Sequence, residues 1–260
     1  MLLAIDIGNT NITLGIWQNK WQHQWRLHTE REKTADEYGI LLKGLLREHG
    51  IGQISHAMLC SVVPPLTTTF HHVCQQYLHT AVSEIHAGLD LGITINVDVP
   101  EAVGADRLVN AAAAYHLFPG PSIVIDMGTA TKLEVITADG QFIGGVIAPG
   151  LGLAADALAT KAAKLSQVPL TAPPSVIGRN TSHAMQSGII LGYVSLIEGL
   201  VQRIKAVHPN RDEAIYIVGT GGLIPLVAGE TAVFDHVDPW LTLTGLQIIY
   251  QRLRGEILND

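Results

Sequence analysis

The chain of 260 residues has few of the features that mark several large classes of protein. Its two cysteines, Cys60 and Cys74, are too few for a disulfide framework and favour free thiols in a reducing compartment. Lys and Arg number 16 against 23 Asp and Glu, without a long basic run, so we expect no nucleic-acid partner. No uncharged apolar run reaches about 18 residues, so no membrane partner is expected. These absences predict a cytoplasmic protein.

Several common site signatures are also missing. No G-x-x-x-x-G-K-[ST] sequence occurs, which excludes a P-loop enzyme. The segment 150–155 fits a loose G-x-G-x-x-A pattern, but no acidic residue follows about 20 positions later, so it lacks the context of a dinucleotide site. His71, His72 and His79 have no partners at zinc spacing. What remains is a chain that is 47% hydrophobic with 26 glycines, a composition typical of a globular α/β protein.

Two segments of the chain resemble each other at a spacing of 120 residues. Residues 3–11, LAIDIGNTN, resemble residues 123–131, IVIDMGTAT. Each has an apolar run, an Asp, a Gly and small polar residues, and each is followed by two further extended stretches separated by turn residues. Both halves of the chain are therefore predicted to begin as strand, Asp-x-Gly turn, strand, turn, strand.

Helical periodicity follows each of these meanders. Apolar spacing predicts helices over residues 34–49, 66–78, 107–117, 181–207 and 243–253, and buried strands over 57–63 and 214–218. The sequence Phe118-Pro119-Gly120-Pro121 separates the halves, which predicts domains at 1–118 and 119–260. Gly188, Gly192 and Gly199 lie within the long predicted helix, where they cost stability unless something packs closely against them.

The two Asp-x-Gly turns have the chemistry of phosphate sites. A tight turn presents backbone N–H groups to phosphate oxygens, and Gly8 or Gly128 leaves room for their approach. Asp6 is a candidate ligand for a Mg²⁺ ion that bridges phosphates, and Asp126 is a second candidate cation ligand. An ordinary β-hairpin is the alternative for one turn alone, and the repeat favours the phosphate interpretation.

Two further segments complete the candidate site. Residues 218–222, VGTGG, end a predicted strand in a turn against which adenine or ribose could lie, although a plain strand–helix turn has the same pattern. Gly104-Ala105-Asp106-Arg107 opens a helix. Asp106 is either the N-cap of that helix or a general base that takes a proton from a substrate hydroxyl. Arg107 could bind a carboxylate or a phosphate.

Together these turns resemble the superfamily of actin, Hsp70 and sugar kinases, and within it the type III pantothenate kinases. The closest matches are DIGNT at 6–10, GADR at 104–107, DMGTAT at 126–131, GGVIAPG at 144–150, GRNT at 178–181 and LTLTGL at 241–246. They cover nearly the whole chain. The resemblance implies a duplicated ribonuclease-H-like (actin-like ATPase) α/β fold, with a cleft between two related domains. It also implies transfer of the ATP γ-phosphate to pantothenate, the first step towards coenzyme A.

The resemblance also implies roles for individual residues. Asp106 is the expected base, and Asp126 is expected to bind a monovalent cation (K⁺ or NH₄⁺). The Mg²⁺ contact expected for Asp6, through the phosphates, rests on the chemistry of its turn instead. Pantothenate contacts are expected from Gly104, Ala105, Asp106, Arg107 and Thr181. The family forms homodimers in which Thr181 comes from the partner, so the active site is expected at the interface. The residues expected to contact ATP are Asp6, Ile7, Gly8, Asn9, Thr10, Asn11, Ile12, Thr13 and Thr129.

Two positions depart from the family pattern. Val97 stands where a Tyr is common, which leaves open a related kinase that acts on another small hydroxy compound. Lys132 follows Thr131 where many members have a second Thr, and it could alter the cation site or replace part of the cation's charge. A nucleotide-binding regulatory protein on the same scaffold is the non-enzymatic alternative, and the presence of Asp106 and Arg107 argues against it.

Overall fold

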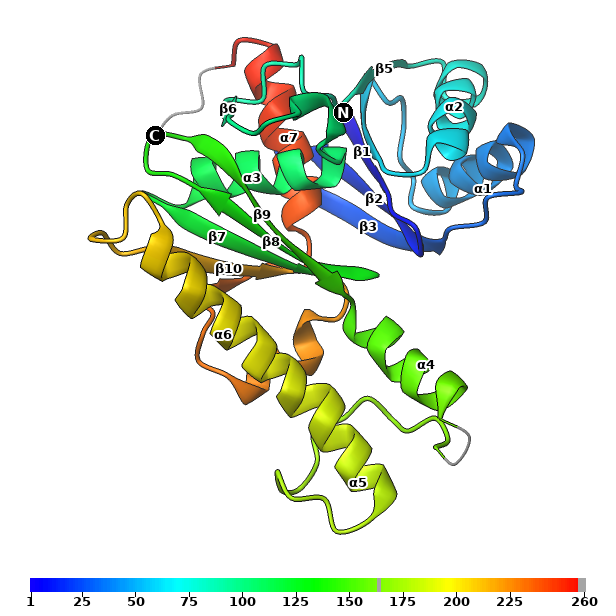
Figure 1. Ribbon diagram of the computed structural model, residues 1–260. Coiled ribbons are helices and arrows are strands. Elements are labelled where there is room, and N and C mark those ends of the chain that lie inside the picture. Colours follow the sequence, from blue (N-terminus) through cyan, green and yellow to red (C-terminus); the bar gives the residue numbers. More distant parts are fainter. Residues whose placement is uncertain (163–164, 257–260) are drawn as a thin grey trace. The chain divides into compact units, whose positions relative to one another are not determined.

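The computed structural model describes residues 1–162 and 165–256, which form two compact α/β units (Figure 1). The first unit contains Met1–Gly92, Asp98–Ala113 and the C-terminal segment from Thr242. The second unit contains Ile93–Val97 and Ala114–Leu241. The helix α3 (Ala105–Leu117) therefore starts in the first unit and ends in the second.

The first unit is built on a five-stranded sheet in the order β3-β2-β1-β4-β5. Strands β1 and β2 and strands β2 and β3 are antiparallel, whereas β4 is parallel to β1 and β5 is parallel to β4. This is the predicted meander, extended by two strands that return through helices. The strands are β1 (Leu2–Ile7), β2 (Asn11–Gln18), β3 (Lys20–His28), β4 (His56–Ser61) and β5 (Ala81–Glu84).

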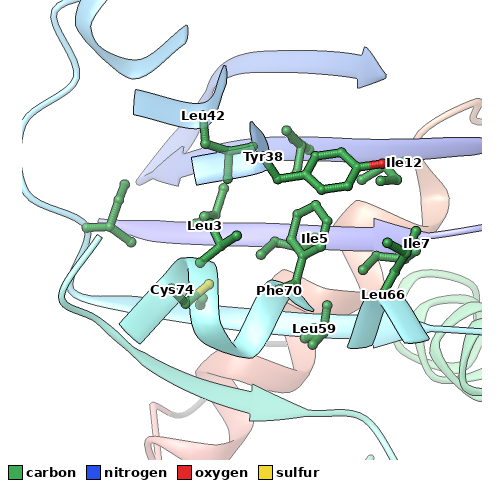
Figure 2. Close-up of a cluster of buried hydrophobic side chains, with 14 of the residues drawn as sticks. Leu3, Ile5, Ile7, Ile12, Tyr38, Leu42, Leu59, Leu66, Phe70 and Cys74 are labelled. Atoms are coloured by element: carbon green, nitrogen blue, oxygen red, sulfur yellow. The ribbon is translucent and has the colours of Figure 1, made fainter. Parts of the chain in front are cut away.

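Helices cover this sheet, and the hydrophobic core of the first unit lies between their side chains and those of the strands. The helix α1 (Ala35–Glu48) begins with a capping box, in which Thr34 and Glu37 satisfy each other's backbone N–H groups. Tyr38 and Leu42 of α1 pack with Phe70 of α2 (Pro64–His72) over the side chains of β1, as Figure 2 shows. A π-helical turn, Val73–Tyr77, continues α2, so the predicted helix over 66–78 is confirmed.

The second unit repeats the same plan in a six-stranded sheet, in the order β11-β10-β7-β8-β9-β6. Strand β7 has the same burial pattern as β1, buried at all positions except the Asp next to its end. The predicted second meander is therefore confirmed. The strands are β6 (Thr94–Ile95), β7 (Ser122–Met127), β8 (Ala130–Ile136), β9 (Gln141–Pro149), β10 (Tyr216–Thr220) and β11 (His236–Val237).

One long helical segment supplies much of the second unit's core. It consists of α5 (Thr181–Gln186), a π-helical turn (Ser187–Leu191) and α6 (Gly192–Val207). The segment from Thr181 to Val207 is long and apolar enough to cross a membrane, but its apolar residues, such as Ile190 and Ile197, are packed in this core. A core helix of a globular domain explains its composition.

Two helices complete the chain. The helix α4 (Leu151–Lys161) follows β9 in the second unit and was not predicted from the sequence. The helix α7 (Leu241–Leu253) packs closely against α3 in the first unit, because a side chain at Gly245 would overlap the backbone oxygen of Val109 at 2.5 Å. A hydrogen bond of 2.9 Å from Thr242 Oγ1 to Asn110 Oδ1 fixes the same pair of helices.

Candidate functional site

The turn between β1 and β2 is closed by its own backbone and supported from outside. Gly8 N donates to Asn11 O at 2.9 Å, and a Cβ at Gly8 would lie only 3.1 Å from that oxygen. Thr29 Oγ1 donates to Gly8 O at 2.7 Å, and Arg31 Nη2 donates to Asn9 Oδ1 at 2.8 Å. The side chains of the turn tip remain exposed. The turn is therefore a fixed rim of polar groups, suited to phosphate oxygens.

Thr29 and Arg31 were not predicted from the sequence. They follow β3, about 20 residues after the turn that they support. No local motif marks them, because their role depends on the return of β3 along β2. A basic residue at this turn also adds positive charge beside a candidate anion site.

The start of α3 lies at the same edge of the sheet as this turn. Strands β1 and β4 are parallel, so Ile7 and Ser61 end side by side, and Val62 N donates to Ile7 O at 3.0 Å. A Cβ at Gly104 would lie 3.6 Å from Val62 Cγ1. The predicted ATP turn and the Gly104–Arg107 segment thus meet at the carboxyl ends of two parallel strands, where α/β sheets bind ligands.

Asp106 is the second residue of α3 rather than its N-cap. The helix begins at Ala105, and Gly104 O accepts from Arg107 N at 3.0 Å. The Asp106 carboxylate accepts from Arg107 N at 2.8 Å, and the residue is half-buried. A carboxylate side chain can accept a proton, which is the chemistry that a general base requires.

In the second unit, the carboxylate of Asp126 is held in an ion pair. Lys132 Nζ lies 2.7 Å from Asp126 Oδ2, and the two side chains are only 13% and 14% exposed. The antiparallel register of β7 and β8 places these residues directly opposite each other. The predicted cation ligand is therefore already in contact with a cationic side chain.

The glycine-rich turn after β10 lies against this carboxylate. Gly221 has φ of +95°, a conformation that favours glycine, and a Cβ there would lie 2.6 Å from both Asp126 Oδ1 and Met127 O. Leu223 N donates to Met127 O at 3.0 Å. The structure therefore brings together two of the predicted segments, the turn at 126–131 and the turn at 218–222.

The turn that carries Thr129 is closely packed on one side. Gly150 N donates to Thr129 O at 3.1 Å, and a Cβ at Gly150 would overlap that oxygen. Tyr193 Oη lies 3.0 Å from Thr131 Oγ1 and also bonds Pro149 O, and burial raises the pKa of this phenol. A Cβ at Gly128 would make only ordinary van der Waals contacts, with Ala130 O and Asp126 Oδ1 at 3.8 Å, and Thr129 is exposed. The open side of the turn is thus the side with small residues.

Thr181 lies away from these turns within the second unit. It begins α5, at the end of the long helical segment that points away from the six-stranded sheet (Figure 1). Asn180 caps this helix by accepting from His183 N at 2.8 Å, and a Cβ at Gly178 would overlap Ala184 N. The GRNT motif therefore shapes an exposed helix start. One chain alone does not bring Thr181 to the turn at Asp126.

Comparison with known proteins assigns the chain to a protein family. A family model of type III pantothenate kinase matches residues 2–203. A type III pantothenate kinase from a Roseiflexus species is 49% identical over 258 residues, which cover 98% of this chain and 100% of the relative. One from Brevibacillus brevis is 46% identical over 255 residues, with coverage of 97% and 99%. The chain belongs to the type III pantothenate kinase family.

Solved structures support the same fold at lower identity. A protein described as a Baf family transcriptional activator from Campylobacter jejuni has a TM-score of 0.61 at 18% identity, covering 97% of this chain and 99% of that one. A ROK hexokinase from Thermus thermophilus has a TM-score of 0.50 at 14% identity, with coverage of 97% and 99%. The predicted duplicated ribonuclease-H-like fold is confirmed for this pantothenate kinase family member.

Proposed function

We propose that this chain transfers the γ-phosphoryl group of ATP to the primary hydroxyl of pantothenate, with Asp106 as the general base. Membership of the type III pantothenate kinase family supports the reaction, which is the first step of coenzyme A biosynthesis. The observation that carries the role of Asp106 is its place in the first turn of α3, at the sheet edge where the turn at Asp6 also lies.

In the proposed reaction, the Asp106 carboxylate accepts the proton of the substrate hydroxyl. The hydroxyl oxygen then forms a bond to the γ-phosphorus while the bond from that phosphorus to the β-phosphate oxygen breaks, which releases ADP. Such transfers depend mainly on positioning and on electrostatic stabilisation. The packing of α7 on α3 through Gly245 and Thr242 keeps the base in position.

The phosphate turns at residues 6–13 and at Thr129 are proposed to contact ATP. Mg²⁺ would neutralise the phosphate charge when bound. In kinases Mg²⁺ is held by one or two carboxylates together with the substrate phosphates, so a single carboxylate is enough to help hold it. Asp6, half-buried at the end of β1, is that carboxylate. Among residues 1–162 and 165–256 no group of three acidic, His or Cys ligands occurs, so a dedicated metal cage is not proposed.

Gly104, Ala105 and Arg107 are proposed to bind pantothenate, together with Thr181 of a second subunit. The exposed face of the long helix supports a homodimer. Gly188 and Gly192 are exposed on it, and a Cβ at either would meet nothing within 4 Å in this chain. Small residues on one helix face allow a second helix to approach closely. We further propose a cytoplasmic location.

Asp106→Asn tests the proposed base. In a coupled assay with ATP, Mg²⁺ and pantothenate, kcat should fall by about a hundredfold or more, as expected for loss of a general base. Asp36→Asn is the matched control, because Asp36 also follows an Ala as the second residue of its helix, α1. Both variants remove a carboxylate from the first turn of a helix, but only Asp106→Asn should lower kcat.

Two outcomes would point elsewhere. A near-normal kcat in Asp106→Asn would reject the base assignment. Turnover with another primary alcohol but not with pantothenate would favour the related kinase that the presence of Val97 leaves open. ATP binding without turnover on any alcohol would favour a regulatory protein.

A further inference from the structure

The strongest unexplained feature of the second unit is the ion pair between Lys132 and Asp126. The two side chains are only 13% and 14% exposed, and the ammonium lies 2.7 Å from the carboxylate. Removing either partner of such a pair leaves an uncompensated charge, which is strongly unfavourable. The pair therefore fixes a positive charge at the end of β7, beside the turn that carries Thr129.

The first unit shows what the same position holds in the related turn. Strands β1 and β2 place Thr13 opposite Asp6, as β7 and β8 place Lys132 opposite Asp126. The first turn thus has a hydroxyl across from its Asp, and the second has an ammonium. The residue opposite the Asp is therefore a neutral Thr in the first unit and a cationic Lys in the second.

A monovalent cation does not fit beside this pair. The resemblance implies K⁺ or NH₄⁺ at Asp126, but Lys132 already occupies Oδ2, and the turn at Gly221 lies against Oδ1. A second cation at this carboxylate would lie within a few ångströms of the ammonium, where like charges repel. Nζ carries the same charge and the same type of N–H donor as NH₄⁺.

We propose that Lys132 replaces the monovalent cation in this protein. Its ammonium supplies the fixed positive charge at Asp126 that supports the phosphate turn, so that catalysis requires Mg²⁺ but neither K⁺ nor NH₄⁺. This inference rests on the proposed kinase function. It differs from the expectation that the family resemblance gives for Asp126.

The first test measures kinase activity of the full chain in Mg²⁺ with choline, Na⁺, K⁺ or NH₄⁺ chloride at constant ionic strength. The wild-type rate should agree within about twofold among all four salts, since the charge at Asp126 is internal. A wild-type rate that needs K⁺ or NH₄⁺ would overturn the proposal.

Lys132→Thr places opposite Asp126 the same residue type, Thr, that lies opposite Asp6 in the first unit. In choline its rate should fall by about tenfold or more, the loss typical of one charge-assisted hydrogen bond. NH₄⁺ or K⁺ should restore much of that rate by filling the vacated place. The control Lys20→Thr removes an exposed lysine at the start of β3 and should leave all four rates unchanged. Full activity of Lys132→Thr in choline would also contradict the proposal.

A second readout does not depend on turnover. Thermal unfolding with Mg²⁺ and a non-hydrolysable ATP analogue should give the same midpoint for the wild type in choline and in K⁺. The midpoint of Lys132→Thr should rise with K⁺, because a ligand that binds only the folded state stabilises it. A K⁺-dependent rise in the wild type would overturn the proposal even if no pantothenate turnover were found. Absence of turnover in every salt, with the midpoints as expected, would count against the proposed function alone.

Discussion

Replacing Gly221 by Ala should destabilise the second unit and displace the turn that is proposed to contact ATP. Its φ of +95° costs a non-glycine residue about 1–3 kcal/mol. The new methyl group would also lie 2.6 Å from Met127 O and from Asp126 Oδ1. The Met127 oxygen belongs to the backbone of β7 and cannot rotate away. The turn or the Asp126 carboxylate must therefore move.

We expect Gly221→Ala to lose at least about 2 kcal/mol of unfolding free energy, a fall in Tm of roughly 4–8 °C for a chain of this size. A displaced Asp126 would also displace the Lys132 ammonium that contacts it. Because misplacement by about 1 Å can cost up to a hundredfold, KM for ATP should rise and kcat/KM should fall. Scanning calorimetry and steady-state kinetics at saturating pantothenate measure the two effects.

Gly152→Ala provides the control for this experiment. Gly152 lies in the first turn of α4, and a Cβ there would have its nearest neighbour, Leu223 Cδ1, at 4.0 Å. Helical Gly→Ala changes stabilise by roughly 0.5–1 kcal/mol, so Tm should hold or rise. If Gly221→Ala kept both the wild-type Tm and the wild-type KM for ATP, the close approach of Gly221 to Asp126 would be wrong.

Two further predictions concern a buried histidine and the exposed glycine face. Burial lowers the pKa of His208, whose Nδ1 accepts from Asn210 N, so the unfolded state binds more protons below about pH 6.5 and stability should fall as pH drops. His208→Gln should flatten the decline of Tm between pH 7 and pH 5 (roughly), and an unchanged slope would contradict this. Gly188→Ala and Gly192→Ala should weaken the proposed homodimer in sedimentation, whereas Gly44→Ala, equally open on α1, should not. Unchanged dimers would move the interface elsewhere.

Local patterns predicted those parts of the fold that local forces decide. The meanders follow from alternation and turn residues, and α1 follows from its capping box and apolar face. Strand β6 escaped prediction because its two residues carry no periodicity and pair with β9, more than 40 residues later. The helix α4 was missed because its first turn is rich in Gly and Ala. Gly150, just before it, is needed for contact with Thr129.

A single motif is enough to identify Asp6 and Asp106 as candidate site residues, and their roles stay predictions. The candidate site was not predictable where residues distant in sequence meet. Arg31 reaches Asn9 only because β3 returns along β2, and Gly221 reaches Asp126 only because β10 pairs with β7. Each of these contacts depends on which strands are neighbours, a property of the sheet that neither segment contains alone.

The pairing of Lys132 with Asp126 depends on a still finer property, the length of one turn. Four residues separate Ile7 from its partner Ile12, but three separate Met127 from Thr131. At the constant offset of 120 residues, Thr13 corresponds to Leu133, and the repeat gives no reason to place a charge opposite Asp126. The shorter turn shifts the register by one residue, which reverses the face of each side chain and brings Lys132 to the carboxylate. For this sequence the three-residue turn places Lys132 opposite Asp126, whereas a four-residue turn between the same strands would place Leu133 there.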